Sequence, residues 1–99
     1  MVTEIAYIVI DPANAEPFET AVARAAEFFK SAKGCRSFAL SRVIETKGAY
    51  RLQVGWDTVD DHMVTFRESE GFQEWRKLAG PFFIEPPRVE HWEETARHF

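Results

Sequence analysis

The stretch YRLQVGWDTVDDH, residues 50–62, determines the fold that we predict for this chain. Its first half alternates in hydrophobicity, as a half-buried strand does, and this strand ends at Trp56. Thr58 and Asp61 follow at the spacing of a capping box, with Asp in place of the usual Glu. The helical segment that begins there carries an apolar stripe, so we expect His62 to point inward. The stripe comprises Val59, His62, Met63 and Phe66.

Turn residues and hydrophobic periodicity predict the elements on either side of this stretch. Four strands are expected, over 3–10, 37–45, 50–56 and 88–94. Asn14 caps a first helix, and Gly34 follows the end of that helix. Ser69 opens a second helical segment, which ends at Gly80. The order β-α-β-β-α-β is that of an α+β, ferredoxin-like fold with an antiparallel sheet, and 99 residues accommodate one such domain, 1–99.

The composition excludes several classes of protein. The net charge of −4 opposes a nucleic-acid-binding domain, and the aromatic content of 14% opposes disorder. No apolar run reaches the roughly 20 residues that span a bilayer. The amino terminus lacks the pattern of a secretory signal peptide. Because a single cysteine, Cys35, cannot form an internal disulfide, we expect a cytoplasmic protein with a reduced thiol.

Both faces of the first strand are apolar, which predicts an oligomer. One face comprises Ile5, Tyr7 and Val9, and the other comprises Ala6, Ile8 and Ile10. The two helical segments of so short a chain cover only one face of the sheet. We therefore expect a homodimer in which two sheets pack face to face.

A series of motifs runs from Trp56 towards the carboxyl end. Trp56 ends a strand, His62 follows the start of a helix, and Ser69 and Phe72 open the next helical turn. This order, continued to the stretch PRVEHW at 87–92, resembles the antibiotic biosynthesis monooxygenase (ABM) domain family of the dimeric α+β barrel superfamily. The resemblance implies a homodimer with a cavity between sheet and helices. Some members of that family oxidise polycyclic phenolic substrates with molecular oxygen, and they use neither metal nor flavin.

Other members of that family degrade haem, but this chain departs from their pattern. They carry an Asn in the first strand, and a Trp and a His in the second helical region. Here the first strand has no Asn, and Phe66 stands in the place of the Trp. Trp75 and Arg76 stand in the place of the His. These departures oppose haem degradation.

The resemblance therefore implies a monooxygenase that acts on a small aromatic or quinone-like substrate. The sequence has no glycine motif for a nucleotide cofactor, and we expect no cofactor. Two alternatives stay open on the same fold. One is a non-catalytic ligand-binding or stress-related protein, and the other is an isomerase or decarboxylase.

His62 is the candidate catalytic residue. An inward imidazole accepts a phenolic proton or holds an oxyanion, whereas the alternative is that it only packs the helix onto the sheet. Trp56, beside it, either stacks on an aromatic ligand or belongs to the core. His91, on the last strand, is a candidate substrate contact. The spacing of the two histidines matches no known metal motif, so we expect no metal.

Four further side chains are candidates for substrate binding. Tyr7 offers a hydroxyl to a quinone or phenol oxygen. Arg42 lies on the apolar face of its strand, where a cation needs a partner, a ligand anion or access to solvent. Phe66 and Phe83 are candidates for a cavity wall. Phe83 also precedes a proline-rich loop, which is a candidate lid.

Overall fold

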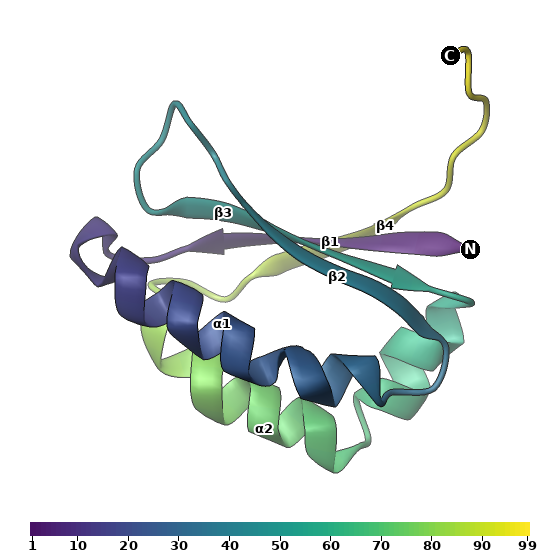
Figure 1. Cartoon of the computed structure of the whole chain (residues 1–99), viewed down its shortest axis with the longest axis horizontal. Coiled ribbons are helices and arrows are strands. Elements are labelled where there is room, and N and C mark those ends of the chain that lie inside the picture. Colours follow the sequence, from purple (N-terminus) through teal and green to yellow (C-terminus); the bar gives the residue numbers. More distant parts are fainter.

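The computed structural model describes the whole chain, residues 1–99. The elements are β1 (Val2–Val9), η1 (Pro12–Asn14), α1 (Ala15–Lys30), β2 (Cys35–Arg42), β3 (Ala49–Trp56), η2 (Asp61–Phe66), α2 (Glu70–Ala79), η3 (Gly80–Phe82) and β4 (Arg88–Trp92). Both long helices lie on one side of the sheet (Figure 1). The expected order β-α-β-β-α-β and the ferredoxin-like fold are confirmed.

The four strands form one antiparallel sheet in the order β2-β3-β1-β4. Its register places Glu4 of β1 opposite Val54 of β3 and opposite His91 of β4. Paired residues share a face of the sheet, and alternate residues of one strand do so too. Glu4 and His91 therefore lie on the same side as Ala6 and Ile8, which belong to the core beneath the helices.

The core lies between this face of the sheet and the helices. α1 turns an apolar stripe towards it at the expected helical spacing, comprising Phe18, Val22, Ala25 and Phe29. Trp56 of β3 is fully buried, and Trp75 of α2 is 8% exposed. The Trp75 ring meets that of Phe29 edge-on, with 5.4 Å between the ring centroids. Such aromatic contacts join the helices to the sheet.

Side chains cap the two helices in different ways. Asn14 precedes α1, but its side chain caps nothing. The Asp11 carboxylate instead accepts a hydrogen bond from the Ala13 N–H and caps the short η1 turn. The Ser69 hydroxyl accepts from the Phe72 N–H at 3.2 Å and caps α2, which begins beside Ser69 as expected.

Two connections differ from those expected. β2 ends at Arg42, because the chain turns where the Thr46 N–H donates to the Val43 carbonyl, and Ile44 is left 90% exposed. Ser31 is the C-cap of α1, so Gly34 belongs to the turn into β2 and not to the helix end. Gly34 has a φ of 78°, a left-handed conformation that favours glycine.

The segment after β3 contains a turn of π-helix, η2. The Arg67 N–H donates to the carbonyl of His62, five residues earlier, at 3.2 Å. His62 and Phe66 of this turn are buried, whereas Met63 within it and Val59 just before it face solvent and are 37% and 39% exposed. The inward position of His62 is thus confirmed. The expectation that Val59 and Met63 share its inward stripe is wrong, because it assumed α-helical spacing.

The outer face of the sheet is not covered by any helix of this chain (Figure 1). At its centre, the guanidinium groups of Arg51 and Arg88 each lie 4.2 Å from the centroid of the Tyr7 ring. The Tyr7 hydroxyl donates to Glu90 at 2.7 Å, and Trp92 on the same face is 53% exposed. The face-to-face dimer stays a prediction.

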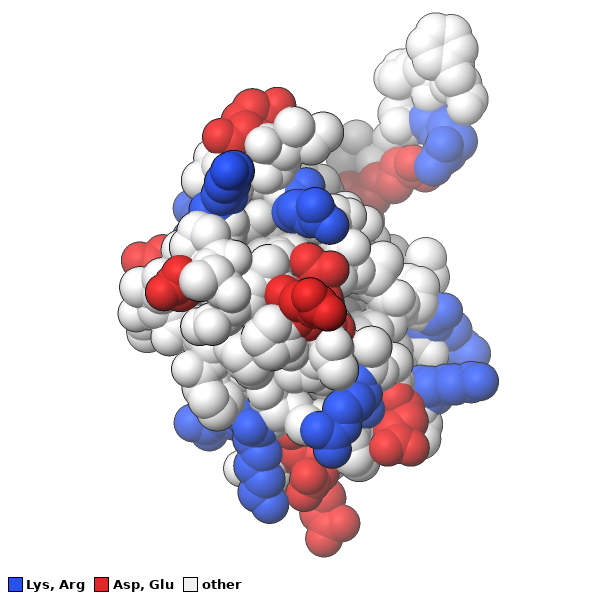
Figure 2. Space-filling view, turned by 60° about the vertical axis from the view of Figure 1, so that its left-hand side comes forward, with Lys and Arg blue, Asp and Glu red and all other residues white.

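Charged side chains are dispersed over the surface. On the face drawn in Figure 2, Lys and Arg alternate with Asp and Glu, and neither sign forms a continuous patch. Beyond β4 the chain leaves the body of the molecule (Figure 1). None of the helices combines the length and the hydrophobicity that crossing a membrane requires.

Candidate active site

A cavity of about 510 Å³ lies between the sheet and the helix layer. Its volume falls within the range of small-molecule sites. The aromatic part of its wall comprises Phe29, Phe66, Phe72, Trp75 and Phe83. The polar and charged residues on its wall are Glu4, His62, Arg67, Arg76 and Glu85. Part of the aromatic interior thus lines an open cavity, while the rest forms the packed core.

Glu4 projects into this apolar surrounding from the middle of the sheet and is only 5% exposed. Its Oε1 atom accepts a hydrogen bond from the Trp56 indole N–H at 2.9 Å and lies 3.3 Å from His62 Nε2. The Oε2 atom has no protein partner. Because no fully buried side-chain polar atom of the chain lacks a partner, Oε2 must reach the cavity.

His62 lies between Glu4 and His91. Its Nδ1 is 2.9 Å from His91 Nε2, and its ring stacks on that of Trp56 with 5.3 Å between centroids. Both nitrogens of the His62 ring are therefore engaged. A neutral imidazole donates from one nitrogen and accepts at the other. The protonation of Glu4 and the tautomer of His62 thus depend on one another.

Burial is the main cause of the shifted pKa values of Glu4, His62 and His91. It raises the pKa of Glu4 from 4.5 to about 7, although the Trp56 hydrogen bond and the charge of Arg67 oppose the rise. Burial lowers the pKa of His62 from 6.5 to about 4, assisted by the charges of His91 and Arg67. Burial, followed by the charge of Arg67, also lowers the pKa of His91. Near neutral pH the imidazoles are uncharged and Glu4 is about half protonated.

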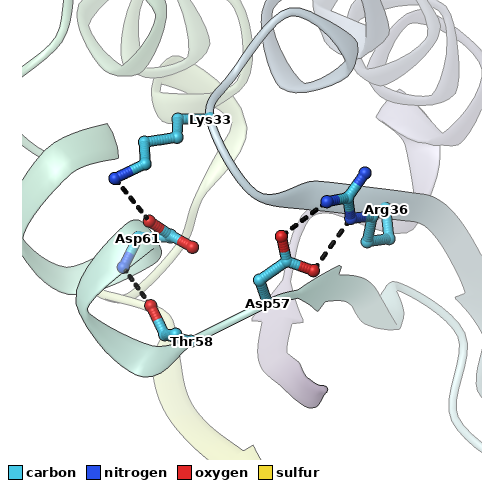
Figure 3. Close-up of polar contacts among 5 residues, drawn as sticks. All are labelled: Lys33, Arg36, Asp57, Thr58 and Asp61. Atoms are coloured by element: carbon cyan, nitrogen blue, oxygen red, sulfur yellow. Dashed lines mark hydrogen bonds and ion pairs between the residues drawn. The ribbon is translucent and has the colours of Figure 1, made fainter.

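Polar contacts at the loops hold η2 beside the end of α1 (Figure 3). The Arg36 guanidinium binds both carboxylate oxygens of Asp57, at 2.8 and 2.6 Å. The Thr58 hydroxyl accepts from the Asp61 N–H at 3.1 Å, which is half of the expected capping box. The Asp61 carboxylate does not complete the box and lies 3.8 Å from Lys33 Nζ. These contacts fix the segment that carries His62.

The structure brings most of the predicted site residues to the cavity or directly behind it. His62, Phe66 and Phe83 lie on its wall, and the proline-rich loop after Phe83 borders it. Trp56 and His91 lie behind the wall. Trp56 is fully buried, so it cannot stack on a ligand, and it acts on the cavity only through Glu4 and His62.

Tyr7 and Arg42 do not reach this cavity. Tyr7 lies on the outer face of the sheet, because odd-numbered residues of β1 point away from the helices. Arg42 lies at the end of β2, 3.8 Å from Glu19, and its side chain is 69% exposed. Arg42 therefore has access to solvent and an acidic partner, which were two of the alternatives considered for it.

Glu4 and Arg67 were not identified from the sequence. A signal for Glu4 was present, since strand alternation from Ala6 and Ile8 places it on the helix-facing side. An acid in that register is a buried carboxylate candidate. Arg67 had no such signal, because its place on the wall depends on the π-helical turn before it. No three His, Cys, Asp or Glu side chains are arranged to hold a metal ion.

The sequence of this chain matches a known protein family and a bacterial relative. The sequence model described as antibiotic biosynthesis monooxygenase (ABM) matches residues 1–78. The uncharacterized protein YczJ of Bacillus subtilis is 36% identical over 95 residues, which is 96% of this chain and 100% of that protein.

Solved structures agree in fold. A Bordetella bronchiseptica protein named "Putative antibiotic biosynthesis monooxygenase" is 48% identical, with a TM-score of 0.93 over 96% of this chain and 97% of its own. SnoaB, a cofactor-independent oxygenase from Streptomyces nogalater, is 21% identical, with a TM-score of 0.80 over 98% and 95% of the two chains. At that identity the likeness to SnoaB concerns the fold alone. From the sequence match over most of its length, the chain belongs to the antibiotic biosynthesis monooxygenase family.

Proposed function

We propose that this chain is a cofactor-independent monooxygenase that oxidises a small aromatic or quinol-type substrate in the cavity. The observation that carries the proposal is the buried pair of Glu4 and His62 on the wall of a cavity lined largely by apolar and aromatic side chains. A general base works best when its pKa lies near the operating pH. A Glu4 pKa of about 7, raised by burial, meets that condition.

The cavity suits a planar substrate that becomes an anion during the reaction. Rings of Phe66, Trp75 and Phe83 offer flat apolar surfaces for an aromatic molecule. Arg67 and Arg76 also lie on the wall, and neither forms an ion pair with a carboxylate of the chain. Their charge favours an enolate or phenolate oxygen over its neutral form. The wall thus combines a base with groups that stabilise the anion that the base produces.

The reaction balances without an external reductant. Glu4 removes a proton from an acidic C–H bond of the substrate, and the resulting carbanion adds dioxygen to form a peroxide anion. The peroxide recovers this proton from Glu4 and becomes a hydroperoxide. Removal of the second proton from the same carbon forms a carbonyl group as the O–O bond breaks, and hydroxide leaves with that proton as water. A methylene group is oxidised to a carbonyl while one dioxygen is reduced.

His62 stabilises Glu4 both when Glu4 is a carboxylate and when it carries the substrate proton. When Glu4 is a carboxylate, the Nε2–H tautomer of His62 presents a proton to it, and when Glu4 is protonated, the other tautomer leaves Nε2 free as an acceptor. The carboxyl group therefore keeps a partner 3.3 Å away in either state. His62 is thus the residue that makes both protonation states of a buried acid tolerable. The family membership supports the same reaction class.

The test is oxygen uptake with anthrone, whose methylene group is acidic, under isotopically labelled dioxygen. We expect the wild-type protein to consume dioxygen above the enzyme-free rate, with one labelled atom in the product carbonyl and one in water. H62A should be slower, and equal rates would remove His62 from the mechanism. Binding of anthrone and of a hydroquinone without any uptake would instead indicate a ligand-binding protein, and conversion of anthrone to its enol tautomer without uptake would indicate an isomerase.

A further inference from the structure

Glu4, His62 and His91 lie in a row on the helix-facing side of the sheet, with a hydrogen bond between the two histidines and a close contact between His62 and Glu4. Distances along it are 3.3 Å from Glu4 Oε1 to His62 Nε2, and 2.9 Å from His62 Nδ1 to His91 Nε2. We propose that His62 and His91 are a proton relay that connects the cavity carboxylate of Glu4 with solvent at the sheet edge. Its role in turnover rests on the function proposed above, but the connection itself can be tested without a substrate.

The outer end of the relay reaches solvent because β4 is an edge strand. β4 pairs only with β1, so no strand of this chain pairs with its other edge. His91 is half-buried, and no hydrogen bond of the protein engages its Nδ1. Since no fully buried polar atom of the chain lacks a partner, Nδ1 must contact water. His62, by contrast, is only 3% exposed.

In the proposed relay, each histidine gains a proton at one ring nitrogen and releases a proton from the other. A half-turn of the Glu4 carboxyl group presents its proton to His62 Nε2, since that terminal torsion is broad. As Nε2 gains the proton, His62 Nδ1 passes its own to His91 Nε2, and His91 Nδ1 releases a proton to water. The reverse sequence returns a proton to Glu4 and restores both tautomers.

The relay would connect Glu4 with solvent when a substrate fills the cavity. An aromatic substrate excludes water from an apolar cavity, and this removes the direct route between Glu4 and bulk solvent. The charged or titratable groups facing His62 are Glu4 from β1, His91 from β4 and Arg67 at the end of η2. The charge of Arg67 disfavours an imidazolium on either ring. The two imidazoles therefore pass protons on and do not store them.

The test measures hydrogen exchange at the ring N–H of His62 by nitrogen-15 NMR of the protein with its cavity filled by naphthalene, an unreactive aromatic molecule that closes the direct route through the cavity. In the wild type we expect fast exchange with water despite burial. H91Q keeps a hydrogen-bonding group at this position but cannot transfer a proton, and H91F fills the space with an apolar ring. Both should slow the exchange by on the order of tenfold, because neither side chain acts as an acid and a base.

A matched control is E90Q, which changes the neighbouring residue of β4 on the outer face and leaves His62 untouched. It should exchange at the wild-type rate. Exchange rates for H91Q and H91F equal to the wild type, with the fold intact by circular dichroism, would overturn the relay.

Turnover provides a second and separable readout. H91Q should lower kcat for anthrone oxidation and leave KM unchanged, and added imidazole buffer should restore kcat. An H91Q protein with the wild-type kcat would remove the relay from turnover. A wild-type protein without oxygen uptake would contradict the proposed function, and the exchange rates alone would then decide the relay.

Discussion

Glu4 is the residue whose environment is least expected in a small domain. An acid that is 5% exposed usually pairs with a cation, but its direct partners here are an indole N–H and a neutral imidazole. Such a site favours the protonated acid, as the raised pKa of Glu4 shows. The protein therefore gives up some stability at this position, which is typical of a functional site.

Glu4 and His62 should influence stability with opposite dependence on pH. The pKa of Glu4 is raised from 4.5 to about 7, so the folded state binds more protons in that interval and Glu4 lowers stability as pH rises. The pKa of His62 is lowered from 6.5 to about 4, so the unfolded state binds more protons and His62 raises stability as pH rises. In the wild type the two effects should largely cancel.

Single variants should remove this cancellation. Between pH 4.5 and 6.5, E4Q should become more stable with rising pH, and H62Q less stable, each by at most about 1.4 kcal/mol per pH unit. Urea unfolding across the interval measures both slopes. Parallel curves for the two variants would show that the pair does not carry these pKa shifts.

Three candidate residues lie on the cavity wall, namely His62, Phe66 and Phe83. The helical period indicated the first two, and the proline-rich loop that follows indicated Phe83, while their roles stay predictions. Glu4 was missed because both faces of β1 are apolar, and an acid near the start of such a strand is easily taken for a solvated end. Tyr7 was a candidate because of its hydroxyl, but strand alternation assigns it to the opposite face.

Among the elements, η2 has the largest influence on the site. Its residues Asp61, His62 and Phe66 are buried, whereas Met63 and Val64 on its other side are exposed. π-helical turns occur often at functional sites. Sequence periodicity predicted a helical segment here but not its π-helical hydrogen bonding, because the hydrophobic pattern fits the α-helical period equally well.

Gly34 tests how the neighbouring turn positions η2. A Cβ atom at Gly34 would lie 2.1 Å from the carboxylate of Asp61, and the φ of 78° disfavours any side chain. G34A should destabilise the protein by at least about 1–2 kcal/mol, the usual cost of a left-handed conformation. It should also displace Asp61 and, with it, the start of η2.

The matched control is G80A at the end of α2. A Cβ there meets nothing within 4 Å, and the backbone is helical, with a φ of −53°. G80A should change stability by no more than about 0.5 kcal/mol. Urea unfolding compares the two variants, and equal losses would contradict a specific role for the turn at Gly34.

For the whole molecule, pattern and length were sufficient to predict the architecture. The six main elements, their order and the antiparallel hairpin are as expected, because each combines a period with a turn or cap signal. The cavity could not be predicted, since an aromatic wall and an aromatic core have the same sequence pattern. The three-dimensional packing of Phe29, Phe66 and Trp75, which leaves a cavity beside them, distinguishes an aromatic wall from an aromatic core.

We propose that the outer face of the sheet forms the dimer interface expected from the sequence. Trp92 is 53% exposed on that face. Sedimentation should give twice the 11.4 kDa of one chain, and W92R should shift the protein towards the monomer. V64R, which replaces a 48% exposed side chain of η2, should leave the mass unchanged. A wild-type mass of 11.4 kDa at micromolar concentration would refute the dimer.

The central claim is that Glu4 is the base of an oxygenation reaction, and the pH dependence of oxygen uptake with anthrone tests it most directly. The wild-type kcat/KM should rise with pH and level off above an apparent pKa of about 7, because only the carboxylate accepts a proton. E4Q should lose about 10²-fold in rate together with this pH dependence. An E4Q protein that keeps the wild-type rate and profile would contradict the account.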